Sequence, residues 1–296
     1  MMERVEALIG QLIAEIDFPQ AYELFSKLSG GKRLRARLIL TIAPSHPDAP
    51  LLGAIIELIH AASLLHDDVI DEATIRRGTA SVNATHGSKV AIMLGDILYS
   101  KAFSALTAFD PRIAHSVAQS VTKLSIGEMM DVEMAKSFNV NRDNYLKMLY
   151  LKTATLIESC AYCAALLENK EADVYGVYGK NLGIAFQIVD DILDITSDEV
   201  TLGKPALNDF AEGKTTLPYI DLYNILDPIE QEKLVGCHGR ILDMQEKEWL
   251  FGVIEKYAII EKSYAYARAL CDEAIAVVPN ESALGAIITS VIQRNH

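Results

Sequence analysis

Cysteine, glycine, proline and basic residues are all scarce in this sequence of 296 residues. Four cysteines in a chain of this length do not make a disulfide scaffold, which favours a reduced, cytoplasmic setting. With 17 glycines, 9 prolines and 50% hydrophobic residues, the chain is not disordered. Its 27 Lys and Arg are outnumbered by 40 Asp and Glu, and the net charge of −13 argues against binding nucleic acid or an anionic membrane surface.

Long hydrophobic runs are missing as well. The longest apolar stretch, Leu51 to Leu65, contains Glu57 and His60 and is expected to be too short to span a bilayer. Charges within residues 1–17 interrupt any signal-peptide core, so that segment is expected to form an amphipathic helix. The chain is therefore not expected to be integral to a membrane.

Helical periodicity runs through the whole chain. Apolar residues recur three and four apart, as between Val5 and Ile16, and no segment alternates apolar and polar residues between turns. Prolines stand at the expected joints between helices: Pro19, Pro44, Pro47, Pro50, Pro111, Pro205, Pro228 and Pro279. We expect no strand and a single all-α domain, residues 1–296, of roughly ten or more helices.

Two acidic motifs share the pattern DDxxD, at 67–71 and 190–194, and each follows a strongly apolar run. Residues four apart on a helix lie on one face about 6 Å apart, so the outer aspartates of each motif form a carboxylate pair that needs a cation. Mg²⁺ usually binds one or two carboxylates together with substrate phosphates. A single copy could be a solvated acidic helix end, but two copies on apolar helices favour a Mg²⁺–phosphate site.

Basic residues are scattered one or two to a segment. The segment GGKRLR, residues 30–35, opens an apolar helix, and glycines before a helix N-terminus allow a phosphate to approach closely. The other candidate cations are Arg76, Arg77, Lys152, Lys204 and Lys214. In an acidic protein this scatter suggests convergence on a small polyanion, although any one lysine could be a solvated surface residue. Gly213-Lys214-Thr215 does not end a P-loop, because position 208 is Asn rather than Gly.

At these residues the sequence resembles the trans-isoprenyl diphosphate synthases. GGKRLR, LLHDDVIDEATIRRG, KTA, FQIVDDILD and GK…EGKTTLP occur in the family's order, between about residues 28 and 220. The resemblance implies an isoprenoid-synthase bundle with a central apolar cavity, usually a cytoplasmic homodimer. It implies Mg²⁺-dependent, head-to-tail condensation of isopentenyl diphosphate with an allylic diphosphate such as farnesyl diphosphate, with about three Mg²⁺ ions on the bound allylic diphosphate.

The resemblance also implies a role for each matching residue. Asp67, Asp71 and Asp190 match Mg²⁺ ligands, and Asp68, Asp191 and Asp194 match residues that assist through water. Positions that hold isopentenyl diphosphate are matched by Gly31, Lys32, Arg35, His60 and Arg77. Positions that hold the allylic diphosphate are matched by Arg76, Lys152, Lys204 and Lys214. Thr153 and Gln187 match groups whose polar atoms face the reacting carbons, and no side chain is assigned as the base.

Product length is predicted from the helix before the first motif. In the family, bulky aromatics four or five residues before the motif stop growth early, whereas here Ser63 and Ala62 are small. One helical turn rises about 5.4 Å, close to one isoprene unit, which places Ile59 one turn further along the growing chain. A product of about C30–C40 for a quinone or related isoprenoid is expected, with Phe103, Met129 or Met130 as the floor and release to a membrane plausible. A short-chain product of about C15–C20 stays open.

Several alternatives and departures accompany this interpretation. His66-Asp67 resembles the adjacent His-Asp pair of metal-dependent phosphohydrolases. The acidic helices would also suit a terpene cyclase. Neither alternative explains all the motifs. A non-catalytic partner subunit of a heteromeric synthase is the other class, although this chain keeps both acidic motifs. Leu207 stands where the family often has glycine, which should stiffen the loop without abolishing activity, and a C-terminal helix is expected to be trimmed. Cys160 and Cys163 are expected in the core rather than in a zinc site, and Met129, Met130 and Met134 either in the core or along a lipid tunnel.

Overall fold

The computed structural model describes residues 1–28, 31–76, 78–196 and 206–293. The chain divides into two compact units, one made of residues 1–121 and 159–176, the other of 122–158 and 177–296. The chain passes between them within three helices, α7 (Pro111–Met134), α9 (Thr155–Leu167) and α10 (Ala172–Thr196). The all-α fold class is confirmed, while the prediction of a single domain over 1–296 stays a prediction.

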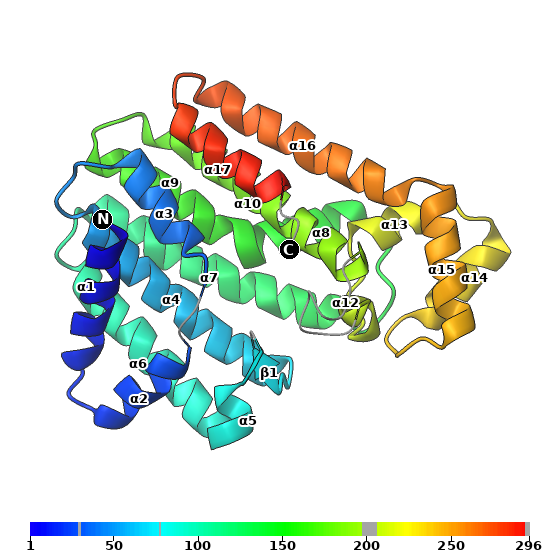
Figure 1. Cartoon of the computed structure of the whole chain (residues 1–296), viewed down its shortest axis with the longest axis horizontal. Helices are drawn as coiled ribbons and strands as arrows, with labels where there is room; N and C mark the ends of the chain where they lie inside the picture. Colours follow the sequence, from blue (N-terminus) through cyan, green and yellow to red (C-terminus); the bar gives the residue numbers. More distant parts are fainter. Residues whose placement is uncertain (29–30, 77, 197–205, 294–296) are drawn as a thin grey trace. The chain divides into compact units, whose positions relative to one another are not determined.

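The first unit is built around one buried helix, α4 (Ala49–Ile70), which contacts α1, α3 and α6 (Figure 1). The expected amphipathic helix at the N-terminus is present as α1, and its buried residues are Val5, Ile9, Leu12 and Ile13. The remaining elements of this unit are α1 (Met2–Ala14), α2 (Pro19–Lys27), α3 (Leu34–Ile42), β1 (Ile75–Arg76), β2 (Thr79–Ala80), α5 (Val82–His86) and α6 (Ser88–Leu106).

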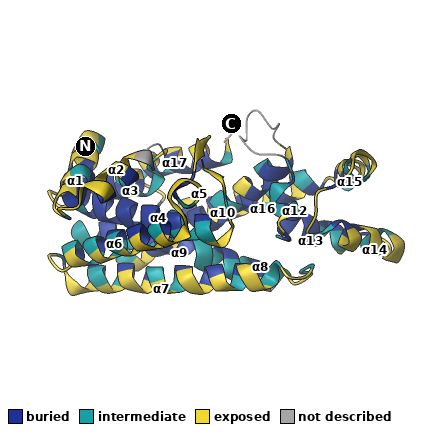
Figure 2. Ribbon diagram, turned by 90° about the horizontal axis from the view of Figure 1, so that it is seen from below, coloured by how far each residue is buried: buried dark blue, intermediate teal, exposed yellow. Residues whose placement is uncertain are grey.

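Helix α4 extends at both ends beyond the apolar stretch, residues 51–65, that was expected to be too short to span a bilayer. By length and composition, its 22 residues would be enough to cross a membrane. It is nevertheless a core helix, because 78% of its apolar window is buried inside the protein (Figure 2). Helix α6 packs closely against α4, since a Cβ placed at Gly95 of α6 would come within 2.3 Å of the His66 ring.

The second unit is also helical, and α16 (Ile259–Val277) contacts α13, α15 and α17 (Figure 1). Its other elements are α8 (Arg142–Leu149), the π-helix η1 (Tyr150–Ala154), α12 (Asn208–Ala211), α13 (Leu217–Tyr223), α14 (Pro228–Cys237), α15 (Met244–Lys256) and α17 (Ser282–Ile292). Prolines open α2, α7 and α14, as expected from a residue whose missing N–H is harmless in the first helical turn.

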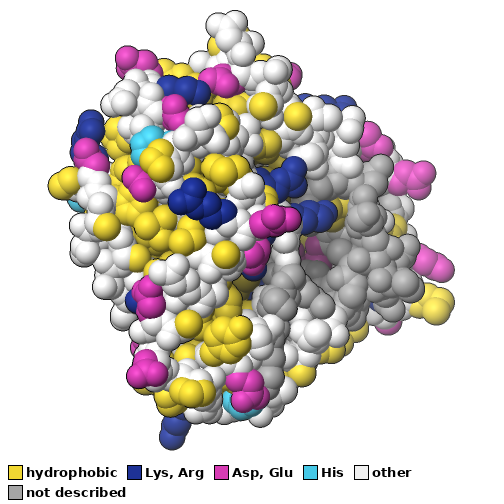
Figure 3. Space-filling model, turned by 60° about the vertical axis from the view of Figure 1, so that its left-hand side comes forward, with side chains coloured by type: hydrophobic (Ala, Val, Ile, Leu, Met, Phe, Trp, Pro, Cys, Tyr) yellow, Lys and Arg dark blue, Asp and Glu magenta, His cyan; other side chains and the backbone are white. Residues whose placement is uncertain are grey.

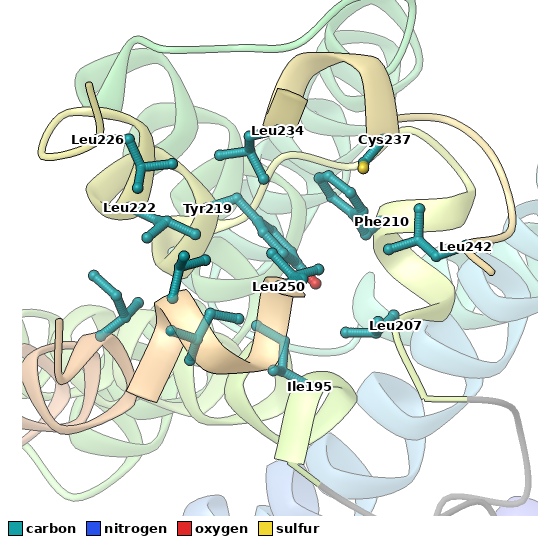
Figure 4. Packing of buried hydrophobic residues seen from close by; sticks show 13 residues of the cluster. Ile195, Leu207, Phe210, Tyr219, Leu222, Leu226, Leu234, Cys237, Leu242 and Leu250 are labelled. Carbon is teal, nitrogen blue, oxygen red and sulfur yellow. The ribbon is translucent and has the colours of Figure 1, made fainter. Parts of the chain in front are cut away.

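A hydrophobic cluster holds α12–α15 of this unit together (Figure 4). Its centre is the stacked pair Phe210 and Tyr219, whose ring centroids lie 4.2 Å apart. Leucines from the surrounding helices pack around the two rings, and Ile195 brings in the end of α10. The end of α10 and the helices α12–α15 are therefore anchored by buried apolar side chains.

A short hairpin departs from the expectation that the chain has no strand. Strands β1 and β2 pair antiparallel, with Ile75 opposite Ala80 and Arg76 opposite Thr79. The positive φ of 75° at Gly78 turns the chain between them, and the Thr79 hydroxyl donates to the Arg76 carbonyl at 3.0 Å. With two residues in each strand, the hairpin lies below the length that periodicity can reveal.

Leu207, where the family often has glycine, adopts the left-handed conformation that glycine tolerates best. Its φ and ψ are 64° and 25°, it directly precedes α12, and its N–H donates to the Asp194 carbonyl at 2.9 Å. This backbone costs a leucine about 1–2 kcal/mol. Its side chain is only 3% exposed within the hydrophobic cluster, which is worth about 1.5–3 kcal/mol and offsets the strain.

Replacing Leu207 by glycine should therefore be no more destabilising than replacing it by alanine. Both changes lose the buried side chain, but only alanine keeps the left-handed strain, whereas at an ordinary helical position alanine is favoured over glycine by about 1 kcal/mol. Chemical denaturation of the two variants would measure the order. A glycine variant clearly less stable than the alanine variant would show that the backbone at this position is not strained.

Candidate active site

The first acidic motif lies on the last turn of α4. Asp71 directly follows the helix, and its N–H donates to the Asp67 carbonyl at 2.8 Å, which keeps the two residues one turn apart. Asp67 is half-buried and Asp71 is exposed. Asp68, by contrast, is 1% exposed and pairs with Arg76, whose Nε lies 2.5 Å from its Oδ1. Burial raises the pKa of Asp68, and Arg76 opposes that rise.

The turn after this motif is fastened by a residue that the sequence did not single out. Asn83 of α5 donates its amide to the carbonyls of Asp68, at 2.9 Å, and of Ala73, at 3.0 Å. The Ser81 hydroxyl donates to the same Ala73 carbonyl at 2.6 Å. These bonds fix the end of α4 and the hairpin that carries Arg76. The local signal is an Asn in the first turn of a short helix, which is too common to be recognised in a sequence.

A buried carboxylate on α4 holds the N-terminus of α3, where the GGKRLR segment ends. Glu57 accepts a hydrogen bond from the Ala36 N–H at 3.1 Å and lies 3.4 Å from a guanidinium nitrogen of Arg33. Arg33 also pairs with Glu6 of α1 at 2.8 Å. Arg35 is enclosed nearby, its Nε has no hydrogen-bond partner, and burial lowers its pKa while Glu57 opposes that shift. A guanidinium is a group that binds phosphate through strong, charge-assisted hydrogen bonds.

The second acidic motif is asymmetric. Asp190 is exposed, whereas Asp191 and Asp194 are buried. Asp194 accepts a hydrogen bond from the Asp209 N–H at 3.1 Å, so it holds the start of α12. Burial and the neighbouring Asp209 and Asp190 raise the pKa of Asp191, although hydrogen bonds from its neighbours oppose this. The motif therefore presents Asp190 to solvent and uses its other two aspartates inside the protein.

Thr153 and Gln187, predicted to face the reacting carbons, are in direct contact. The Thr153 hydroxyl donates to Gln187 Oε1 at 3.0 Å, and Gln187 Nε2 donates to Asp191 Oδ1 at 3.0 Å. The hydroxyl of Tyr145, a residue of α8 that the sequence did not indicate, donates to the other oxygen of Asp191. The sequence could not indicate Tyr145, because 46 residues separate it from Asp191.

Lys152 lies in the π-helix η1 with two carboxylates around its ammonium. Its Nζ is 2.5 Å from Asp131 Oδ2 and 2.8 Å from Glu128 Oε2, both on α7. Burial alone would lower the pKa of Lys152, but Asp131 and Glu128 outweigh it and raise the pKa, so the lysine stays cationic. The backbones of α7 and η1 approach closely here, since a Cβ on Gly127 would lie 2.3 Å from the backbone nitrogen of Lys152. The i, i+3 spacing of the two acids was the one available sequence signal.

The other predicted diphosphate-binding residues are less enclosed. Gly31 and Lys32 are exposed just before α3, and His60 is half-buried on α4. Lys214 pairs with Glu212 at 2.7 Å. Arg77 and Lys204 lie outside the described residues, so their predicted roles stay predictions.

The residues of α4 that were predicted to set product length are all buried. Ala62 and Ile59 are fully buried, and the Ser63 hydroxyl donates to the His60 carbonyl at 2.9 Å. Met129 is 74% exposed on α7, so the expectation that it lies in the core is wrong, while its expected place along a lipid tunnel stays a prediction. Phe103 and Met130 are half-buried.

The described residues give no support to the rival metal chemistries. His66 bonds the Ile92 carbonyl at 3.1 Å and lies 3.5 Å from Asp96, so it has structural partners on α6. Cys160 and Cys163 are buried free thiols, as expected. Within residues 1–28, 31–76, 78–196 and 206–293, no group of three or more His, Cys, Asp or Glu side chains could by itself hold a metal ion.

Each acidic motif by itself nevertheless offers donors that suit a hard divalent cation whose coordination is completed by a ligand. Asp67, Asp71 and Asp190 supply oxygen donors that are exposed or half-buried. Mg²⁺ characteristically takes one or two carboxylates and completes its coordination with water and substrate phosphates, so a closed protein cage is not required.

Comparisons with known proteins agree with this inventory. The polyprenyl synthetase family matches residues 19–253. The short chain isoprenyl diphosphate synthase of Methanothermobacter thermautotrophicus is 32% identical, over 99% of this chain and 95% of that protein. The crystal structure of octaprenyl pyrophosphate synthase from Helicobacter pylori has a TM-score of 0.93 and 40% identity, covering 99% of this chain and 100% of that chain. The polyprenyl synthase of Caulobacter crescentus, complexed with calcium and isoprenyl diphosphate, has a TM-score of 0.89 and 26% identity over 100% of this chain and 95% of that one.

The match over most of the chain, together with the two acidic motifs and their cationic neighbours, has one interpretation. This chain belongs to the polyprenyl synthetase family and is an isoprenyl diphosphate synthase, a prenyltransferase of isoprenoid biosynthesis.

Proposed function

We propose that this prenyltransferase extends an allylic diphosphate, such as farnesyl diphosphate, with isopentenyl diphosphate to an all-trans product of about C30–C40. The observation that carries the chain length is the pair of small side chains, Ala62 and Ser63, one turn before Asp67 on α4. The 40% identity to the octaprenyl synthase of Helicobacter pylori supports it. Quinone side chains or related isoprenoids are the proposed destination, and the cytoplasm is the proposed compartment.

The family uses divalent metal ions with diphosphate substrates. In this chain Asp67, Asp71 and Asp190 would hold Mg²⁺, which neutralises the charge of the departing diphosphate. Lys152 keeps its positive charge beside Asp131 and Glu128, and it is proposed to bind the allylic diphosphate together with Arg76, Lys204 and Lys214. Gly31, Lys32, Arg35, His60 and Arg77 are proposed to bind isopentenyl diphosphate. The oxygens of Thr153 and Gln187 face the allylic carbons, where positive charge develops.

Two alternatives have distinct outcomes in one assay. The relative from Methanothermobacter thermautotrophicus is named a short chain synthase, which favours a product of about C15–C20. A non-catalytic partner subunit would make no product alone. Purified chain, Mg²⁺, isopentenyl diphosphate and farnesyl diphosphate would be incubated and the products separated by reversed-phase chromatography. A main product longer than C20 supports the proposal, a shorter one supports the short-chain alternative, and none supports the partner subunit.

Replacing Arg35 by alanine tests the assignment of the two diphosphate sites. We expect the KM for isopentenyl diphosphate to rise about ten- to a hundred-fold, because a charge-assisted hydrogen bond is worth about 1.5–3 kcal/mol. The KM for farnesyl diphosphate should change far less. Arg37→Ala removes an exposed arginine from the same helix and is the matched control. Equal changes in both KM values would mean that Arg35 serves a shared site or the fold.

A homodimer is also proposed, and exposed apolar side chains support it. Ile126, Met129 and Val132 of α7 are exposed at spacings of three, so they share one side of the helix. Hydrophobic side chains also gather between isolated charges on the face shown in Figure 3. Sedimentation of the wild type should give a dimer, and Met129→Glu should shift it toward the monomer. A monomeric wild type would contradict the proposal.

A further inference from the structure

A chain of hydrogen bonds joins Tyr145 to the two polar groups proposed to face the reacting carbons. It runs from the Tyr145 hydroxyl to Asp191, from Gln187 Nε2 to Asp191 at 3.0 Å, and from the Thr153 hydroxyl to Gln187 Oε1 at 3.0 Å. The four residues come from three elements, α8, η1 and α10. Tyr145 is 1% exposed and Asp191 4%, so this end of the chain is shielded from water.

The order of donors in this chain fixes the direction of the Gln187 amide. An amide has one end that accepts and one that donates, and the carboxylate of Asp191 accepts from both of its partners. The NH₂ group of Gln187 therefore faces Asp191, and its carbonyl oxygen takes the proton of the Thr153 hydroxyl. Because its proton is already donated to Gln187, the Thr153 hydroxyl can present only oxygen lone pairs to a neighbouring ligand. Lone pairs stabilise a cation, whereas an outward O–H dipole would oppose it.

We propose that Tyr145 is a positioning residue for the prenyl-transfer reaction. Its hydroxyl holds the carboxylate of Asp191 in the orientation that fixes the Gln187 amide, and so keeps the lone pairs of Thr153 available to the allylic cation. This inference rests on the proposed placement of Thr153 and Gln187 at the reacting carbons. It gives the two aspartates that begin the second motif separate tasks, because the exposed Asp190 is the proposed Mg²⁺ ligand and the buried Asp191 is an anchor.

Tyr145→Phe removes only the hydroxyl and is the direct test. We expect kcat to fall about ten-fold or more, in keeping with the loss of a hydrogen bond to a charged group. Both KM values should stay near wild type, since neither proposed diphosphate site changes. Tyr178→Phe is the matched control. That buried tyrosine on α10 donates to the Leu284 carbonyl at 2.9 Å and takes no part in the hydrogen bonds that join Tyr145 to Thr153. Tyr178→Phe should lose similar stability and keep kcat. Equal kcat in the two variants would overturn the inference.

A double-mutant cycle separates positioning from a general structural effect. Thr153→Val should lower kcat. Adding Tyr145→Phe to it should lower kcat no further, because both changes act through the Thr153 hydroxyl oxygen. Fully additive losses would overturn the inference. If Thr153→Val leaves kcat unchanged, the proposed role of Thr153 fails instead. If Thr153→Val is impaired but Tyr145→Phe is not, only the role of Tyr145 fails.

A second variant covers the case in which Tyr145→Phe does not fold. Asp191→Asn keeps the shape of the side chain but can donate to Gln187, which allows the amide to reverse. We expect the same fall in kcat with unchanged KM values. Wild-type kcat in a folded Asp191→Asn protein would overturn the inference.

Discussion

Replacing Asp67 or Asp190 by alanine is expected to lower turnover by roughly two to three orders of magnitude while leaving the helical fold intact. Diphosphate leaves only when its charge is neutralised, and each of these carboxylates is a proposed Mg²⁺ ligand. Neither is deeply buried, since Asp67 is half-buried and Asp190 is exposed. Turnover at saturating Mg²⁺ and substrates, together with circular dichroism, would measure both effects. Chelation of the metal should lower the turnover of the wild type to a similar degree.

Asp194→Ala is the informative comparison within the same motif. Its carboxylate is buried and accepts the Asp209 N–H, so we expect its removal to lower the free energy of unfolding by about 1–3 kcal/mol, the cost of leaving that partly buried N–H without its partner. Asp190→Ala should scarcely change stability. Near-normal turnover in either Asp67→Ala or Asp190→Ala would contradict the metal assignment.

Ala62→Phe is expected to shorten the main product from about C30–C40 to about C15–C20 without abolishing catalysis. The phenyl ring would block growth along α4 one turn from Asp67, while the proposed diphosphate-binding side chains stay in place. Ala62 is fully buried, so the larger side chain should also destabilise the protein by about 1–3 kcal/mol. Reversed-phase chromatography of the products, at a temperature where the variant stays folded, gives the length.

Two further variants test whether the position along α4 sets the product length. Ile59→Phe acts one turn further from Asp67 and adds less volume, so it should give a product between those of Ala62→Phe and the wild type. Ala61→Phe adds the same ring about 100° round the helix and should leave the length unchanged. A long product that persists in both Ala62→Phe and Ile59→Phe would show that another element sets the length.

Sequence patterns predicted the helices well, because apolar spacing is a property of each segment by itself. The 3.6-residue period around Val5 and Ile9 indicated α1, and prolines marked the starts of α2, α7 and α14. The acidic motif at the end of α4 was also expected on a helix, because its outer aspartates are four residues apart. Hairpin β1–β2 was not predicted from the sequence, because two residues per strand are too few to show an alternating pattern.

The acidic motifs were visible, but the different environments of their members were not. Adjacent aspartates on a helix point about 100° apart, and apolar residues on both sides of the motif gave no sign which one faces inward. Asp190 and Asp191 therefore looked equivalent in the sequence, although one is exposed and the other buried. Tyr145 and Glu57 were missed for a related reason, since their partners are brought together only by tertiary packing.

The close approach of α7 to η1 at Gly127 limits how this enzyme can diversify. No side chain fits between that glycine and the Lys152 backbone, so neither alanine nor any larger residue can enter without moving the segment that carries Lys152 and Thr153. Under the proposed role of α4, substitutions in that helix can change the product, whereas this contact leaves almost no freedom for substitution. Lineages that alter product length are expected to keep the glycine.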